Sequence, residues 1–223
     1  MTDGATRGVI AGSLNRIPQP VLGLVSAVDP VTHSCKVLIQ PDETETGWLP
    51  FMSLAVGDLR ISAPPHVGQQ VQVLPQEGDA EHNVVTGSLF DDIVGAPVSP
   101  ATGEVAQPGE MLIQTGCGAP PQDTTVRTAG AATSGAPYWH ITPAVLYFGA
   151  GTVSGSVRNG SFVVKVGSCV MTLSASGLAI TGGTITTDGN VVAQGDVKTS
   201  EHSLKSHVHT NGNDGADTGG PVG

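Results

Sequence analysis

Glycine interrupts the sequence every few residues after about position 162, and this spacing limits what the chain can fold into. The apolar runs between the glycines are too short for helices and suit short β-strands. In the run that contains Phe162, Val164 and Val166, every second side chain lies on one face. Strands this short cannot bury enough apolar surface within one chain of this size. We therefore expect three copies to share one core, as a closed, intertwined β-prism without exposed sheet edges.

The part of the chain from Val21 to about Phe90 predicts a different all-β unit. Short apolar runs alternate there with turn residues such as Asp29-Pro30 and Pro41-Asp42. This pattern predicts five strands, at residues 21–28, 35–40, 48–54, 70–74 and 83–90. A five-stranded Greek-key barrel of the OB type is the most economical arrangement for them, and we expect Trp48 in its core.

Proline and glycine punctuate residues 94–123 so often that long regular elements are excluded there. The expected fold class is therefore all-β, with a barrel and a trimeric β-helix or β-prism joined by an irregular segment. The domain organisation that we expect is an N-terminal arm over residues 1–20, the barrel over 21–95, a linker or collar over 96–125, a β-helical shaft over 126–200 and an apex over 201–223.

Composition narrows the possible functions. The 223 residues include 9 Lys+Arg and 19 Asp+Glu, a net charge of −10 that repels nucleic-acid phosphates and anionic membrane surfaces. The three cysteines, Cys35, Cys117 and Cys169, lie far apart without CxxC spacing, so neither a disulfide framework nor a zinc ribbon is expected. There is no signal-peptide pattern and no run of about 18 apolar residues. We expect cytosolic synthesis and contact with a membrane only from outside it.

Two separated stretches resemble the baseplate assembly protein V family, the central spikes of contractile-tailed phages, which are related to the spikes of type VI secretion and pyocins. The N-terminal matches are GLVSAVD at 23–29, GWLP at 47–50, PHVGQQV at 65–71 and VVTGSL at 84–89. The C-terminal matches are GDV at 195–197, SLKSHVH at 203–209 and TGGP at 218–221.

This resemblance implies an OB domain that docks on the tail hub, followed by a trimeric β-helix with a metal-capped point. It implies a place in the tail baseplate of the virion, after synthesis in the host cytoplasm. It also implies a mechanical role, in which sheath contraction drives the spike through the outer membrane of the host. Neither an enzymatic activity nor nucleic-acid binding is expected.

His207 and His209 are the candidate metal ligands. If the chain is extended there, their i, i+2 spacing places both imidazoles on the same side. Three such strands around a threefold axis supply six imidazoles, which suits an octahedral ion and not tetrahedral zinc. Iron, one ion per trimer, is the metal that the resemblance implies. An isolated HxH would instead suggest a solvated pair, and His202 is expected to be an exposed shaft residue.

Other polar clusters carry weaker hypotheses. The run from Asn211 to Asp217 has the residue types of a calcium loop but lacks the bidentate glutamate of an EF-hand, so a turn-rich hairpin is favoured. The carboxylates of Asp188, Asp196 and Glu201 could be imagined as a catalytic set in a β-helix groove. No GxSxG or HExxH motif accompanies them.

The OB-like barrel leaves one alternative function, a binding module for single-stranded nucleic acid or glycan. Such modules combine a basic groove with stacking aromatic side chains. Between Val21 and Phe90 the only basic residues are Lys36 and Arg60, among many acids. A barrel that docks on protein is therefore favoured, and the expected partners are two further copies, the hub and, transiently, the host outer membrane.

Overall fold

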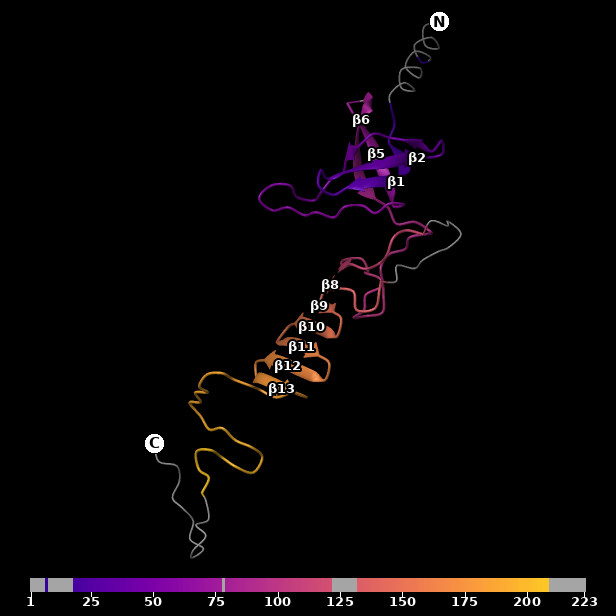
Figure 1. Ribbon diagram of the computed structural model, residues 1–223. Coiled ribbons are helices and arrows are strands. Elements are labelled where there is room, and N and C mark those ends of the chain that lie inside the picture. The colour runs from indigo at the N-terminus through magenta and orange to yellow at the C-terminus, as the bar shows by residue number, and fades with distance from the viewer. Residues whose placement is uncertain (1–6, 8–17, 78, 122–131, 209–223) are drawn as a thin grey trace, which may run out of the picture. The chain divides into compact units, whose positions relative to one another are not determined.

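The computed structural model describes residue 7 and residues 18–77, 79–121 and 132–208 (Figure 1). These residues form thirteen strands, β1 to β13, arranged in two antiparallel sheets. The chain divides into one compact unit that ends at Thr181 and a second that begins at Gly182, and the two are described separately. Within the described ranges, no helix is both long enough and apolar enough to cross a membrane.

The first sheet curls into a closed barrel. Strand β1 pairs with β2 and β5, β5 pairs with β6, and β2 pairs with β3 and β4. Just after β4, Phe51 forms a parallel bridge with Val85 of β6, and the Met52 amide donates to the Val85 carbonyl at 2.8 Å. The circuit β1, β2, β4, β6, β5 and back to β1 is the OB-type barrel that the sequence predicts. Its strands are β1 (Val21–Asp29), β2 (Ser34–Ile39), β3 (Thr44–Glu45), β4 (Leu49–Pro50), β5 (Gln70–Gln76) and β6 (Asp79–Ser88).

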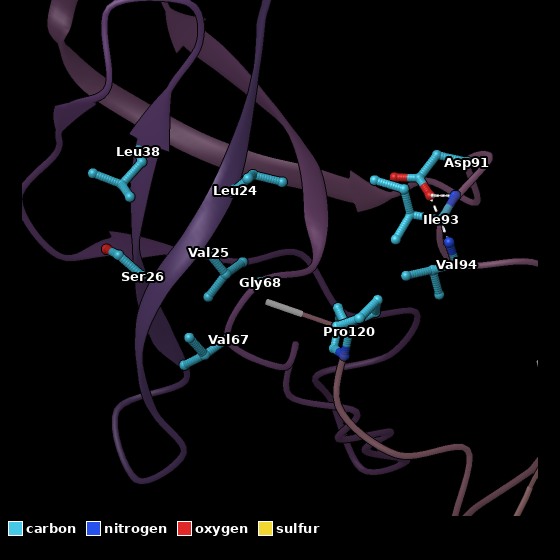
Figure 2. A pocket seen from close by; sticks show the side chains of 11 residues that line it. Leu24, Val25, Ser26, Leu38, Val67, Gly68, Asp91, Ile93, Val94 and Pro120 are labelled. Carbon is cyan, nitrogen blue, oxygen red and sulfur yellow. Dashed lines mark hydrogen bonds between the residues drawn. The ribbon is translucent and has the colours of Figure 1, made fainter. Parts of the chain in front are cut away.

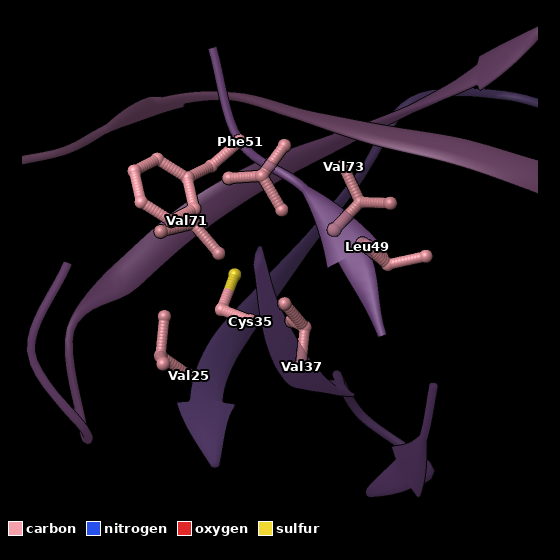
Figure 3. Packing of buried hydrophobic residues seen from close by; sticks show 8 residues of the cluster. Val25, Cys35, Val37, Leu49, Phe51, Val71 and Val73 are labelled. Carbon is pink, nitrogen blue, oxygen red and sulfur yellow. The ribbon is translucent and has the colours of Figure 1, made fainter. Parts of the chain in front are cut away.

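Alternating residues of these strands fill the barrel. The buried cluster is aliphatic apart from one phenylalanine and one thiol (Figure 3): Val25, Cys35, Val37, Leu49, Phe51, Val71, Val73 and Val85. The prediction that Trp48 belongs to this core is wrong, because the inward positions of its segment are Leu49 and Phe51. Trp48 is 52% exposed, and the Lys36 ammonium lies 5.6 Å from its ring centroid.

The third predicted strand is shorter than the sequence pattern indicates. Only Leu49–Pro50 and the bridge at Phe51 pair with neighbours, and the chain then leaves the barrel as a long loop before β5 begins at Gln70. Prolines at 64 and 65 and glycines at 57 and 68 keep this loop out of the sheet.

The second sheet is a simple meander in which each strand pairs with its neighbours in sequence, from β13 to β7. Four of its connections are two-residue turns, at 151–152, 159–160, 167–168 and 175–176, and Gly160 provides the positive φ of 73° that such a turn requires. The first strand lies inside the segment expected to be a linker. The strands are β7 (Met111–Gln114), β8 (Tyr138–Ile141), β9 (Val145–Ala150), β10 (Val153–Arg158), β11 (Ser161–Val166), β12 (Cys169–Ser174) and β13 (Gly177–Thr181).

Candidate functional site

One face of the meander is apolar along its whole length. Residues directly opposite one another in paired strands project on the same face, so the register identifies the members of each row. The central row is Ile113, Trp139, Phe148, Gly155, Val164, Met171 and Ile180. The flanking row is Met111, Ile141, Leu146, Val157, Phe162, Leu173 and Leu178. We call these two rows the apolar face.

The apolar face remains accessible in a single chain. Leu178 is 61% exposed, Trp139 59% and Leu173 51%. An apolar surface of this extent is rare on a monomer and marks an interface. The sequence predicted the inward alternation of Phe162, Val164 and Val166, but the strands from Tyr138 to Arg158 that extend the face were not identified.

A glycine at the centre of the apolar face leaves room for an aromatic ring of the neighbouring strand. The Phe148 ring lies directly over Gly155 of the neighbouring strand, where a β-carbon would overlap the ring. Phe148 also stacks on Phe162, with ring centroids 6.5 Å apart. A glycine that is covered by a cross-strand aromatic ring in this way retains its place in a β-ladder without loss of packing.

The opposite face carries a buried Ser-His-Glu cluster. Nδ1 of His140 on β8 lies 2.8 Å from Oγ of Ser99, and its Nε2 lies 3.2 Å from Oε2 of Glu110. The Gln107 amide, together with His140, holds the pKa of the Glu110 carboxyl below its usual value, so this carboxylate accepts from Nε2–H. Nδ1 then accepts from the Ser99 hydroxyl, whose oxygen accepts from the Ala101 amide.

This cluster is a fastening and not a catalytic triad. Ser99 is fully buried and His140 is 1% exposed, so a substrate has no access to the hydroxyl. The cluster instead ties the irregular segment around 98–110 to the second sheet. No local sequence pattern points to this cluster, because Ser99 and His140 are 41 residues apart.

A hollow of about 320 Å³ lies where the barrel meets the segments that follow it (Figure 2). Asp91 contributes the one carboxylate in its lining, and Oδ1 of this residue accepts from the amides of Ile93 at 2.8 Å and Val94 at 2.6 Å. Pro120 stands 3.4 Å from where a β-carbon of Gly68 would be. The lining is otherwise mainly aliphatic, so the hollow offers packing and no catalytic group.

The second unit contains the residues before the predicted metal site. The Asp196 carboxylate accepts from the Ser203 hydroxyl at 2.5 Å and from the Lys205 amide at 3.1 Å, and the Leu204 amide donates to the Val197 carbonyl. Asp196 therefore closes a tight turn and is not positioned as a catalytic acid. His202 is exposed, as predicted, and it lines a hollow of about 510 Å³ together with His207.

The backbone holds the His207 ring through its Nδ1. Its Nδ1 lies 3.1 Å from the Ser203 carbonyl oxygen and 3.0 Å from that of Leu204. Because carbonyls only accept, Nδ1 carries a proton, and Nε2 is the ring nitrogen with which this histidine would coordinate a metal. Histidine ligands in metal sites are held by this kind of hydrogen bond.

The rest of the predicted site lies outside the described residues, namely His209 and the run from Asn211 to Asp217. In the part of the chain that the structure describes, no three His, Cys, Asp or Glu side chains come close enough together to hold a metal ion.

The three short strands expected after β13 do not form in a single chain. Residues 184–186 and 190–193 are unpaired with any strand of the described chain, and 196–198 contributes only the bridge between Lys198 and Ser203. Their aliphatic side chains are largely exposed, including Ile185 at 68% and Val192 at 87%.

Residues 21–90 match the family model of the type VI secretion system/phage-baseplate injector OB domain. The barrel of this chain is therefore similar to the baseplate injector OB domain, and the match covers 70 of the 223 residues. The match spans the barrel, from the first residue of β1 to just after the end of β6. This match of the barrel implies a structural role of the spike type in a baseplate and suggests a place in a virion tail. A search of the curated proteins found no match to the chain.

Proposed function

We propose that this protein is the homotrimeric central spike of a contractile phage tail, which opens the host outer membrane by force during sheath contraction. The apolar face of the meander carries this proposal. Three such faces turned toward a common axis would bury one another, and the polar faces would point outward. The three sheets would then form a closed prism, the architecture expected from the glycine spacing.

Assembly is tested by light scattering on the purified full-length protein. We expect a mass of three chains of 22.5 kDa at micromolar concentration. A stable monomer under these conditions would refute the spike, because a single chain leaves its largest apolar surface in water.

The continuous strand pairing of the meander supports a mechanical role for the spike. In the meander, hydrogen bonds connect every strand to the next without a break, and most of the connections are too short to flex. A prism of three such sheets resists bending and compression. Its action on the membrane is tested by comparing intact tails with tails that carry a dissociated spike variant, with dye release from outer-membrane vesicles as the measurement.

We further propose that the barrel docks the spike on the tail hub through protein contacts. The barrel carries few basic side chains, and its exposed aromatic Trp48 is already occupied by Lys36. These features favour a protein partner over single-stranded nucleic acid. A variant without residues 1–95 should remain a trimer and fail to enter tails. Normal incorporation of this variant would show that the barrel is not the docking domain.

His207 and His209 of three chains are proposed to hold one octahedral metal ion, with iron as the expected ion. The backbone contacts of His207 Nδ1 support this proposal, as does the need for more than one chain to complete a ligand set. A bound ion would cross-link the three strands at the tip. Elemental analysis should give one metal per three chains, and the double variant His207→Ala, His209→Ala should lose the metal while it stays trimeric. One metal per chain, or full metal content in the variant, would place the ligands elsewhere.

A further inference from the structure

The loop between β4 and β5 presents an apolar tip to solvent. We call residues 53–61 of this loop the apolar hairpin. Three of its aliphatic side chains are among the most accessible of the barrel domain: Leu54 is 90% exposed, Val56 75% and Leu59 68%. Its only charged residues, Asp58 and Arg60, have opposite signs. A protruding, electrically neutral and aliphatic segment of this kind is suited to burial in an apolar groove.

The apolar hairpin has a fixed shape despite its exposure. The Ile61 amide donates to the Ala55 carbonyl at 3.0 Å, and Val56 and Arg60 form an antiparallel bridge. Arg60 Nε donates to the Gly57 carbonyl at 3.2 Å, and the Ser53 hydroxyl donates to the Ile61 carbonyl. Because the backbone is already organised, little conformational entropy would be lost when the tip binds a partner.

A complementary groove lies on the barrel wall beside β4, β5 and β6. Its volume is about 690 Å³. The apolar part of its lining is Trp48, Leu49, Pro50, Met52, Leu74 and Val84, and the polar part is Gln76, Glu81, His82, Asn83 and Thr86. Met52 is 62% exposed and Trp48 is 52% exposed, so the groove is not filled. The apolar hairpin of the same chain does not occupy it either, since Leu54, Val56 and Leu59 remain in solvent.

We propose that the apolar hairpin of each chain docks into this groove on a neighbouring copy. This inference rests on the proposed trimer, which would tether three barrels close to one another and raise their effective concentration. Every copy carries both the hairpin and the groove. A contact of this kind between different surfaces of identical chains closes into a ring when the copies are related by rotation. The three barrels would then form a collar of their own.

The test is chemical cross-linking of the full chain in a Cys117→Ser background, which removes the exposed native thiol. The double variant Leu59→Cys, Gln76→Cys places one thiol on the hairpin and one at the groove. We expect a short bismaleimide to give covalent species of two and three chains. The matched control is Val31→Cys with Gln76→Cys, since Val31 is 93% exposed in the turn between β1 and β2. The control and each single variant should give only the background of the two remaining native cysteines.

The outcomes separate this inference from the proposed function. A trimer by light scattering that gives no multi-chain species, or as many as the control, overturns hairpin exchange and leaves the spike intact. Cross-links within one chain, or between Leu59→Cys and a hub protein in assembled tails, also overturn it. A protein that is monomeric by light scattering overturns the spike itself.

Discussion

The barrel and the meander are built from the same kind of strand, but the barrel is a closed sheet and the meander is an open one. Both consist of short, valine-rich antiparallel strands with apolar residues at every second position. In the barrel, the parallel bridge between Phe51 and Val85 closes the sheet on itself, so that the apolar face becomes a core within one chain. The meander has no bridge between its first and last strands, and its apolar face stays open. Closure, more than side-chain pattern, decides whether a β-sheet folds alone or needs partners.

The largest effect is expected from a charge on the apolar face. Val164→Glu should abolish the trimer, because burying three carboxylates near the axis would cost several kcal/mol for each unpaired charge. Light scattering measures the loss directly. The matched control is Lys165→Glu, one residue away on the polar face, which should remain trimeric. If both variants dissociate, or neither does, the apolar face is not the contact between chains.

A cavity in the barrel should have a large effect that stays local. Phe51→Ala removes a core ring and leaves the backbone bridge to β6 in place, and we expect a loss of about 3–5 kcal/mol in barrel stability. Since burial raises the pKa of the Cys35 thiol and shields it, Cys35 labelling in urea reports barrel opening specifically.

The proposed trimer should survive Phe51→Ala, because the proposed contact between chains is the apolar face of the meander and not the barrel. Phe90→Ala, at a ring that is 68% exposed, serves as the control and should change the labelling little. Dissociation of the Phe51→Ala variant would show that the two regions do not fold independently.

A smaller effect is expected where the irregular segment is fastened to the meander. Ser99→Ala leaves Nδ1 of buried His140 without its partner, which should cost about 1–3 kcal/mol. Hydrogen exchange should rise in residues 98–110 and in β8 but not in the barrel. Glu104→Gln, at an exposed side chain of the same segment, should leave exchange unchanged. Equal exchange in both variants would mean that the Ser99 contact contributes nothing.

The smallest effect concerns the first turn of the barrel. The Thr32 hydroxyl and the Val31 amide donate to the Asp29 carboxylate and hold its pKa below the ordinary 3.8. A depressed pKa adds stability that is present above the unfolded value and is lost as the pH falls through the folded value. The barrel of Asp29→Asn should therefore lose less stability than the wild type on acidification below about pH 4. The measurement is the protection of Cys35 during parallel acid titrations of the wild type and the variant. Identical titration curves would contradict this prediction.

Much of the fold could be predicted because its signals are local. Turn residues and two-residue alternation located β1, β2, β5 and β6 closely, and the glycine corners located β11 to β13. The third barrel strand was predicted to be longer than it is. Trp48 was misplaced because alternation alone does not say which of the two sets of side chains faces the core, and the pairing of Leu49 and Phe51 decides it. The strands from Tyr138 to Arg158 lie within the predicted shaft at 126–200, but their bounds were not predicted, because the aromatic and proline positions of this segment show no simple alternation.

The site was predictable only in part, and for a similar reason. The spacing of His207 and His209 is a local pattern, so the sequence can propose these two histidines as metal ligands, and the proposal stays a prediction. The His140 fastening joins residues far apart in sequence, and the apolar face is a property of register across seven strands. Neither can be derived before the pairing is known.

The strictly sequential pairing of the meander also makes its length adjustable. Because each strand contacts only its neighbours in sequence, inserting or removing one two-strand hairpin leaves the register of every other pair unchanged, as in repeat proteins. Each strand adds about 4.8 Å to the sheet. If the proposed spike function holds, related chains with more or fewer hairpins would have shafts of different length and the same barrel.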